Sequence, residues 1–308
     1  MPTTFVDFDT GAGKDSYSSK AYYNSEIFRH LFGGSPSDWG SKLAIRSGVN
    51  WDRMQKIAKD FGLSTDYVQG INLSDECINF QSASDLQQHL QNWGCTSVAS
   101  GHIIGQTLDL FTVELCIVKD GDATFVTMPP YLCLLGMGKH LAMCTNHLFD
   151  KVNFAGMPIS HLRRTLLDLG SIGEAVAYLK SVVHKGVTTS VNFMISDGTQ
   201  AVDIEVTPQA VRVLYPKQVE GIPAVQAHTN HLLPTTFDQD TQCARLQIAS
   251  KGLLEKKSVE DTLCQMGVVQ PIDEAAQFGT IITVWLDPKE RILAYKDPGQ
   301  DTFTRLKV

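Results

Sequence analysis

The sequence predicts an α+β protein in which two antiparallel sheets pack together and helices cover them. Strand-like segments form two groups after residue 94, and helical segments stand between and after these groups. Residues 1–94 differ from the rest, because they are predicted to be mostly helix and loop. Since no repeat or low-complexity linker divides the 308 residues, we expect one domain in which residues 1–94 wrap around residues 95–308.

Two helices are expected before residue 94. Asn50 caps the first, and its apolar residues recur at helical spacing from Met54 to Phe61. The second covers residues 84–93, directly before the sequence becomes strand-like.

Hairpin and capping signals set the order of the remaining elements. The first strands are expected at residues 98–109, 112–118, 124–128 and 141–148, with an Asp-Gly turn at Asp120-Gly121. Helices follow at residues 160–169 and 171–182, the second opened by the capping box Ser171-Ile172-Gly173-Glu174. The second group of strands is expected at residues 190–195, 201–206, 211–215 and 224–228, with a turn at residues 196–198. Helices at residues 240–254 and 258–266 precede two last strands at residues 280–286 and 291–295.

The composition argues against several classes of partner. A net charge of −7 and a pI near 5.7 provide no attraction to phosphate backbones, so nucleic acid is not an expected partner. The N-terminus lacks a basic region followed by an apolar stretch, and no segment is long enough to span a bilayer. We therefore expect a soluble cytoplasmic protein without a membrane partner. The seven cysteines have no CxxC spacing, which predicts neither a disulfide framework nor a zinc site.

The most informative segment is Gly94-Cys95-Thr96-Ser97, where helical sequence gives way to strand-like sequence. A cysteine that begins a chain can use its own α-amine, with a reference pKa of about 7.7–8.0, as the base that its thiol needs. A preceding glycine allows a strained backbone and leaves the scissile carbonyl open to the Cys95 sulfur. The pattern predicts cleavage between Gly94 and Cys95. The alternative is a buried structural cysteine in a strand.

Seven stretches in a fixed order make the chain similar to a known family. They are Gly94-Cys95-Thr96-Ser97, Gly105-Gln106-Thr107-Leu108-Asp109, Cys144-Thr145-Asn146, Gly156-Met157-Pro158 with its helix, Val202-Asp203-Ile204-Glu205-Val206-Thr207-Pro208, His228-Thr229-Asn230-His231, and residues 280–288. Together they cover most of residues 94–300. With these motifs the chain resembles the isopenicillin N acyltransferase family of N-terminal-nucleophile amidohydrolases (peptidase family C45), which is similar in turn to the bile-salt hydrolases.

The resemblance implies a four-layer αββα sandwich and a precursor that cuts itself before Cys95. Cys95 is then the nucleophile, its new amine is the base, and Asp109 holds that amine by a charge-assisted hydrogen bond. Asn146 and Asn230 stand where related enzymes place donors to the oxyanion. The alternatives are a strand end facing water for Asp109 and turn or cap chemistry for the two asparagines.

Two further residues match the family less specifically. Arg245 lies in a helical stretch and matches an active-site arginine, and a solvated arginine on a helix face is an equal alternative. Ser97 is expected to align the scissile peptide through its hydroxyl. His228 and His231 flank Asn230, but no third ligand at metal-like spacing accompanies them, so we expect neither a metal nor a cofactor.

Two departures from the family pattern concern the substrate. Thr107-Leu108 replaces the usual Asn-Trp before the aspartate, and Gln277-Phe278-Gly279 stands where penicillin-forming members have an arginine, so penicillin chemistry is not expected. We predict an autoprocessed cysteine amidohydrolase or acyltransferase that acts on a small amide or acyl thioester, with acyl-CoA as a candidate co-substrate. Its own 1–94 fragment is the expected protein partner, and oligomer formation is compatible with the sequence.

Two other functions remain open at this stage. A papain-like hydrolase would use a downstream histidine as its base, although the aromatic-flanked cysteine signature of that class is absent. A binding or scaffold protein could keep the fold without cutting itself, and residues 1–94, which lack the glycine-spaced pattern of many family members, leave room for this interpretation.

Overall fold

The computed structural model describes residues 2–32, 52–76, 94–148, 156–234, 243–275 and 277–308. The helix predicted at residues 84–93 and the predicted cap Asn50 lie outside these ranges, as do the first residues of the helix predicted from residue 240. The remaining predicted elements can be compared with the structure directly.

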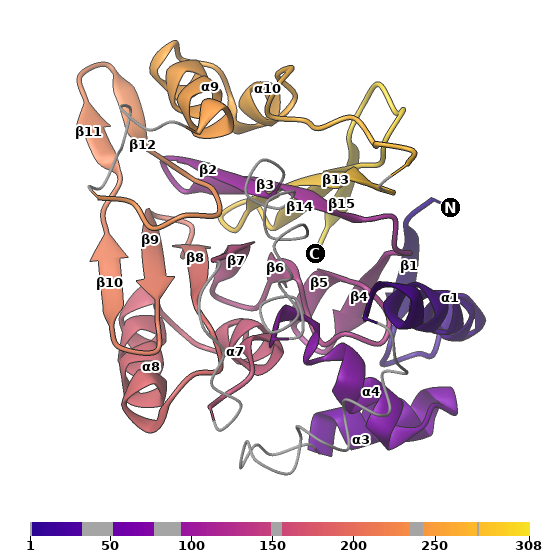
Figure 1. Ribbon diagram of the computed structural model, residues 1–308. Coiled ribbons are helices and arrows are strands. Elements are labelled where there is room, and N and C mark those ends of the chain that lie inside the picture. Colours follow the sequence, from indigo (N-terminus) through magenta and orange to yellow (C-terminus); the bar gives the residue numbers. More distant parts are fainter. Residues whose placement is uncertain (1, 33–51, 77–93, 149–155, 235–242, 276) are drawn as a thin grey trace.

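Two sheets form the centre of the molecule (Figure 1). The eight-stranded sheet has the order β1 (Thr4–Asp7), β4 (Cys116–Asp120), β5 (Ala123–Thr127), β6 (Leu135–Met137), β7 (Ala142–His147), β8 (Val191–Ser196), β9 (Ala201–Val206) and β10 (Val211–Leu214). The seven-stranded sheet has the order β11 (Lys217–Val219), β12 (Ile222–His228), β2 (Thr96–Ser100), β3 (Ile103–Phe111), β13 (Phe278–Asp287), β14 (Ile292–Lys296) and β15 (Thr304–Lys307). All pairings within them are antiparallel except that of β1 with β4.

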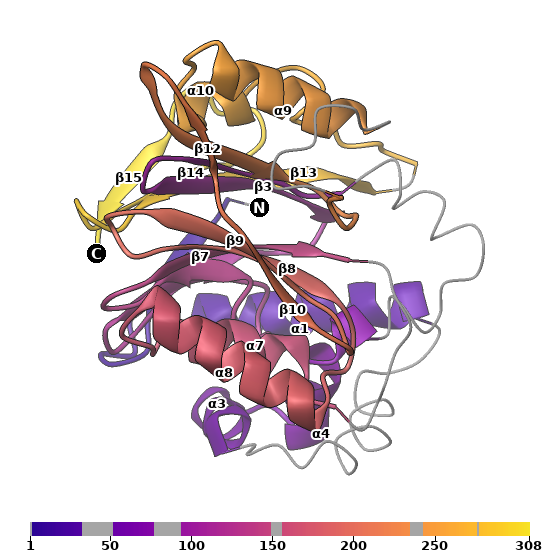
Figure 2. The same ribbon diagram turned by 90° about the vertical axis from the view of Figure 1, so that its left-hand side faces the viewer.

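Helices cover both outer faces, which confirms the predicted α+β, αββα sandwich (Figure 2). On the eight-stranded side lie α1 (Lys14–Phe32), α3 (Asp52–Phe61), α4 (Thr65–Ile71), α7 (Ile159–Leu166) and α8 (Ile172–Lys185). On the seven-stranded side lie α9 (Ala244–Leu254) and α10 (Val259–Leu263). None of the described helices is long and apolar enough to cross a membrane.

Three buried apolar clusters hold these layers together. The first joins the eight-stranded sheet to its helices, with Met143 and Phe193 packed against residues such as Leu162 and Leu179. The second fills the space between the sheets, and the third joins the seven-stranded sheet to α9 and α10. Alternate side chains of a strand point to opposite faces, so neighbouring strand residues enter different clusters.

The predicted capping box forms in part. The Ser171 hydroxyl accepts a hydrogen bond from the Glu174 N–H at 3.2 Å, as expected at the start of α8. The Glu174 carboxylate reaches the N–H of Gly170 at 2.9 Å instead of the N–H of Ser171. The first bond satisfies a backbone donor that the first turn of α8 leaves without a partner, and the second satisfies the N–H of the residue before the N-cap.

The single strand predicted at residues 98–109 is wrong, because the chain reverses within it. Gly101 has φ +62°, in the left-handed region, and the turn at Gly101-His102 separates β2 from β3. The alternation of apolar residues continues on both sides of this turn, which hid it in the sequence. The resulting register places Thr96 opposite Thr107, so that Cys95, just before β2, lies close to the C-terminal part of β3.

Other boundaries differ for local reasons. The strand predicted from residue 112 starts only at Cys116, because the N–H of Thr112 donates to the Gln277 carbonyl and that of Glu114 to the Asn24 side chain. β1 was missed in a region predicted as helix and loop, and it adds a parallel edge to the eight-stranded sheet. β6, β11 and β15 were missed because three or four residues give too short an alternation.

Replacement of Gly101 tests the turn that sets this register. Gly101→Ala should lower the free energy of unfolding by about 1–2 kcal/mol, because an L-residue is strained at positive φ, and Gly101→Asn should cost less. Urea denaturation measures both. Gly173→Ala, inside α8, is the control and should not destabilise, because the nearest atom to the new methyl is the Ser171 hydroxyl at 3.8 Å, an ordinary van der Waals contact. Equal losses of unfolding free energy for Gly101→Ala and Gly173→Ala would contradict the positive φ of Gly101 in this turn.

Candidate active site

Cys95 lies at the start of the β2–β3 hairpin and is 6% exposed. The N–H of the next residue, Thr96, donates to the Thr107 hydroxyl at 3.2 Å, which fixes the backbone after Cys95. The Cys95 sulfur lies 4.0 Å from the backbone carbonyl oxygen of Asp109. The hairpin thus brings the predicted nucleophile and the predicted aspartate together, although fourteen residues separate them in the sequence.

The Asp109 carboxylate has one satisfied and one unsatisfied oxygen. Thr280, its cross-strand neighbour on β13, donates its hydroxyl to Oδ1 at 2.6 Å, and that hydroxyl accepts the Gln270 N–H at 2.8 Å. Oδ2 is buried and has no hydrogen-bond partner among the described residues. Burial raises the pKa of Asp109 to about 7, against the opposing effects of Thr280 and Arg245. An ammonium group beside Oδ2 would remove this unfavourable burial of an unpaired oxygen.

The Cys95 thiol is held in its neutral form. Burial, with a smaller contribution from the Asp109 carboxylate, raises the pKa of Cys95 to about 11. Because only the thiolate is strongly nucleophilic, attack by Cys95 at neutral pH requires a base that takes the thiol proton.

The Arg245 side chain donates hydrogen bonds to the Gly94–Cys95 peptide. It comes from α9, is 4% exposed, and donates through Nη1 to the carbonyl oxygen of Gly94. The same nitrogen lies 2.9 Å from the Cys95 carbonyl oxygen and 3.2 Å from the Thr96 hydroxyl. The alternative of a solvated helix-face arginine is therefore wrong.

Asn230 packs against the same peptide from the end of β12. A Cβ atom on residue 94 would lie 2.2 Å from Asn230 Oδ1, so a larger residue at this position would displace the Asn230 side chain. Asn230 Oδ1 accepts from Nη2 of Arg245 at 3.3 Å, and its Nδ2 donates to the His147 carbonyl at 2.8 Å. One of the two amide protons remains for another acceptor.

Ser97 and Asn146 form a separate contact. The Ser97 hydroxyl donates to Asn146 Oδ1 at 2.6 Å, and Asn146 Nδ2 is buried without a hydrogen-bond partner among the described residues. This bond joins the two side chains between the sheets, and it does not involve the Gly94–Cys95 peptide. The roles predicted for Ser97 and Asn146 stay predictions.

Gln106 joins the two sheets directly behind Cys95. Its side-chain amide donates to the Thr145 carbonyl and accepts the Thr145 N–H at 2.8 Å. A hydrogen bond from Gln106 also lowers the pKa of Cys95, against the larger effect of burial. Gln106 lies in one of the seven motifs, but no role was predicted for it.

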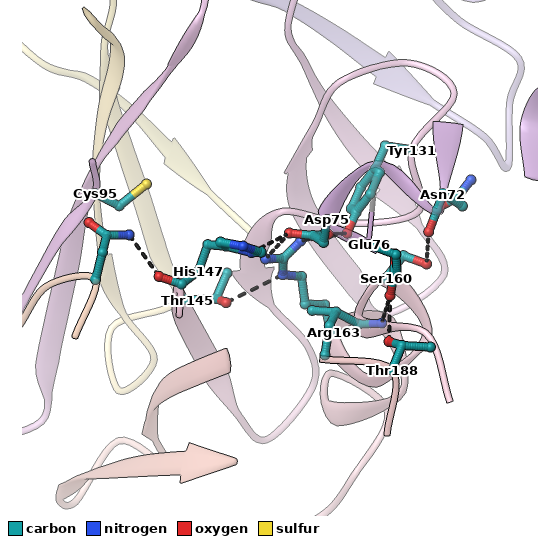
Figure 3. Close-up of polar contacts among 12 residues, drawn as sticks. Asn72, Asp75, Glu76, Cys95, Tyr131, Thr145, His147, Ser160, Arg163 and Thr188 are labelled. Atoms are coloured by element: carbon teal, nitrogen blue, oxygen red, sulfur yellow. Dashed lines mark hydrogen bonds and ion pairs between the residues drawn. The ribbon is translucent and has the colours of Figure 1, made fainter. Parts of the chain in front are cut away.

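A buried ionic network beyond Asn230 was missed by the sequence analysis (Figure 3). Asp75 pairs with Arg163 at 2.9 Å and with Nδ1 of His147 at 3.3 Å, and it accepts the Tyr131 hydroxyl. Burial alone would raise the pKa of Asp75, but Arg163 and His147 hold it well below its usual range. Since the His147 carbonyl accepts from Asn230, the network connects residues before Cys95 with the amide beside Gly94. Arg163 among apolar helix residues was the available signal for it.

Glu76, the residue after Asp75, is hydrogen-bonded to Ile159 and Thr188. It accepts the N–H of Ile159 at 3.1 Å, at the start of α7, and the Thr188 hydroxyl at 2.5 Å. Burial and the neighbouring Asp75 carboxylate raise the pKa of Glu76. Residues 75 and 76 are therefore fixed to the part of the chain that follows Cys95.

The arrangement suits attack of a thiol on a carbonyl. It combines a cysteine, a buried carboxylate with one unsatisfied oxygen, and a guanidinium on the carbonyl of the preceding residue. Within the described ranges, no group of three His, Cys, Asp or Glu side chains is arranged to hold a metal ion.

Several solved structures are distantly similar to the chain. No model of a known protein family matches the sequence, and no curated protein matches it significantly. A mutant of conjugated bile acid hydrolase from Clostridium perfringens is 12% identical, with a TM-score of 0.44 over 70% of this chain and 92% of that chain. An N-acylethanolamine-hydrolyzing acid amidase ortholog from Caenorhabditis elegans is 16% identical, with a TM-score of 0.46 over 63% of this chain and 93% of that chain.

Penicillin V acylase from Agrobacterium tumefaciens is also similar. It is 12% identical, with a TM-score of 0.45 over 70% of this chain and 78% of that chain. Likeness at this level does not establish a shared activity, so the function has to follow from the side chains.

The raised pKa of Asp109 predicts a pH-dependent stability of the intact chain. The folded-state value of about 7 lies above the ordinary 3.8, so the protonated form favours folding below pH 3.8 and this contribution is lost as the pH rises to about 7. In an uncleavable Cys95→Ala chain, Asp109→Asn should remove a slope of up to about 1.4 kcal/mol per pH unit in this window. Urea denaturation at several pH values measures the difference. Parallel pH profiles with and without Asp109 would contradict it.

Proposed function

We propose that the protein is a self-processing cysteine amidohydrolase or acyltransferase with Cys95 as its nucleophile. The observation that carries the proposal is the bond from buried Arg245 to the carbonyl oxygen of Gly94. That carbonyl is the one that the Cys95 thiol, on the next residue, would attack. The positively charged guanidinium beside the Gly94 oxygen stabilises the negative charge that develops on this oxygen during attack.

Self-cleavage proceeds by a shift of the acyl group from nitrogen to sulfur. The Cys95 sulfur bonds to the Gly94 carbonyl carbon, the bond between that carbon and the Cys95 nitrogen breaks, and the thiol proton ends on the nitrogen. Asp109, with a pKa of about 7, can carry this proton near neutral pH. Water then hydrolyses the thioester, which gives a Gly94 carboxylate and restores the thiol.

The new α-amine of Cys95 then serves as the base for substrate turnover. Its reference pKa of about 7.7–8.0 suits proton transfer near neutral pH. The unsatisfied Oδ2 of Asp109 offers an acceptor for the ammonium form of this amine. The unpaired Asp109 Oδ2 is unfavourable in the intact chain, and in the cleaved chain the new ammonium group would pair with it.

The proposed substrate is a small amide or an acyl thioester such as acyl-CoA. Cys95 takes the acyl group as a thioester, the amine protonates the leaving group, and water or a second amine collects the acyl group. Arg245 and the second amide proton of Asn230 are the proposed oxyanion donors. Membership of the isopenicillin N acyltransferase family is part of this proposal and rests on the ordered sequence motifs.

The first fragment is proposed to stay bound after cleavage. β1 pairs with β4, and Lys20 pairs with Glu114 at 3.2 Å in a buried position. Asp75 adds its buried ion pair with Arg163. Removal of one partner of such a pair leaves a buried charge, which typically costs about 3–5 kcal/mol. One cooperative domain of two chains is therefore expected.

Self-cleavage is tested by intact mass under denaturing conditions. The wild-type chain should give fragments of 94 and 214 residues that co-purify under native conditions, whereas Cys95→Ala should stay at 308 residues. Arg245→Met should slow cleavage by about 10²–10³-fold, because it removes the donor to the Gly94 oxygen. Lys251→Met, at an exposed site on the same helix, is the control and should cleave normally. A wild-type chain that stays intact after prolonged incubation would disprove the proposal.

Substrate turnover tests the role of Asn230. On any substrate found among fatty-acyl and aryl-acyl amides and thioesters, processed Asn230→Ala should lose about 2.7–4 kcal/mol of transition-state stabilisation, seen mainly in kcat. An increase in KM alone would make Asn230 a substrate-binding residue. An active, processed enzyme in which no acyl group can be trapped on Cys95 would count against the covalent mechanism.

A further inference from the structure

A second buried ionic group lies at the base of the segment that carries Asn230. His228, the last residue of β12, is fully buried, and so is Glu205 of β9. His228 Nε2 lies 3.1 Å from Glu205 Oε1, which joins the seven-stranded sheet to the eight-stranded sheet. The mechanism proposed above uses neither residue.

Both ring nitrogens of His228 face acceptors that have no proton to give. Nδ1 lies 2.7 Å from the carbonyl oxygen of Thr229, and Nε2 faces the Glu205 carboxylate. A neutral imidazole has only one N–H group, so it could satisfy one of these contacts. Only the imidazolium form donates to both.

Glu205 holds the far end of the same segment. Its Oε1 also accepts the N–H of Leu233 at 2.6 Å, and its Oε2 accepts from Arg212 Nε at 2.7 Å. The His228–Glu205 pair thus holds both ends of residues 229–233: His228 bonds to the Thr229 carbonyl, and Glu205 bonds to the Leu233 N–H. Asn230 lies between these two points.

We propose that doubly protonated His228, paired with Glu205, is a positioning residue that fixes residues 229–233 and holds the Asn230 amide at the reacting carbonyl. The inference rests on the proposed function of Asn230 as an oxyanion donor. The inference adds the charged His228–Glu205 pair to the proposed site. Among the described residues, neither member of this pair forms a hydrogen bond with Cys95 or with the scissile peptide. A donor displaced by about 1 Å can cost on the order of 10²-fold in rate, so a rigid hold on Asn230 matters for catalysis.

The charges around His228 favour its protonated form. Asp203, on β9, is buried and accepts from the Asn192 and Gln226 side chains, and Arg212 lies on the far side of Glu205. His231 contacts the Thr229 hydroxyl at 3.0 Å, and Arg245 contacts Asn230. Burial by itself lowers the pKa of His228, but Asp203 and Glu205 outweigh it and raise the pKa above 6.5.

The two pKa shifts define the pH range of the ion pair. The contribution of His228 to stability is complete below pH 6.5 and is lost as the pH rises through its raised pKa. Burial alone would raise the pKa of Glu205, but hydrogen bonds from His228 and Leu233 lower it below 4.5. The Glu205 contribution is complete above pH 4.5 and is lost as the pH falls through that lowered pKa.

The charge state of His228 can be measured without a substrate. Nitrogen-detected NMR of the histidine-labelled wild type and of intact Cys95→Ala should show both His228 ring nitrogens protonated at neutral pH, with the signals assigned by their loss in His228→Gln. His102, which pairs with Asp287 at 3.3 Å but is 27% exposed, is the control ring. The Asn230 side-chain amide, assigned with Asn230→Ala, should shift or broaden in His228→Gln but not in His102→Gln.

Kinetics separate positioning from a purely structural role. Processed His228→Gln should lose about 10- to 100-fold in kcat with KM within about twofold, and its self-cleavage should slow by a similar factor. His102→Gln should behave as wild type in both assays. If His228→Gln does not fold, Glu205→Gln replaces it, since this variant keeps an acceptor for Leu233 but removes the negative charge.

The outcomes distinguish this inference from the proposed function. A neutral His228 ring at neutral pH overturns the inference even in an active enzyme. A folded His228→Gln with unchanged kcat, unchanged self-cleavage and an unchanged Asn230 amide signal also overturns it. If the wild type neither cuts itself nor turns over any amide, the proposed function fails, while the NMR measurements still decide whether charged His228 fixes Asn230.

Discussion

The buried guanidinium of Arg245 is the interaction on which the candidate site depends. Among the ion pairs of the described residues none includes Arg245, so carbonyl, hydroxyl and amide oxygens hold its charge. A buried cation that has no carboxylate within ion-pair distance among these residues is unfavourable. Negative charge on the Gly94 oxygen would relieve that cost, and in the proposed mechanism it would arise in the transition state of attack by Cys95 and not in the ground state. This difference is what a catalytic group must provide.

The interior between the sheets is divided in a way that serves this site. One part is apolar, with Ile104, Val126 and Met194 among its residues. The other part carries buried polar side chains from both sheets, namely Ser97, Gln106, Asn146, Asn192, Asp203, Glu205, Gln226 and His228. Buried polar groups cost free energy unless they are hydrogen-bonded, so their bonds across the interior restrict how the sheets can sit relative to each other. The apolar part supplies stability, and the polar part supplies alignment.

Asp75, which precedes Cys95 in the chain, is bonded to residues that follow it. Asp75 binds Arg163 and His147, and the His147 carbonyl holds the Asn230 amide. These contacts do not require an intact Gly94–Cys95 bond, so cleavage would free the Cys95 amine without removing the support of Asn230. The Asp75 contacts therefore support the Asn230 amide through His147.

The sequence by itself determined the turns at Asp120-Gly121 and at residues 196–198, the helix α3, the N-cap Ser171 of α8, and the grouping of strands into two sheets covered by helices. Periodicity and turn chemistry act over a few residues, so the printed order reveals them. Only the tertiary structure decided that Gly101 turns the chain, that Arg245 is buried on the Gly94 carbonyl, and that Asp75 reaches His147. These outcomes depend on contacts between residues up to 151 positions apart, whose partners no local pattern specifies.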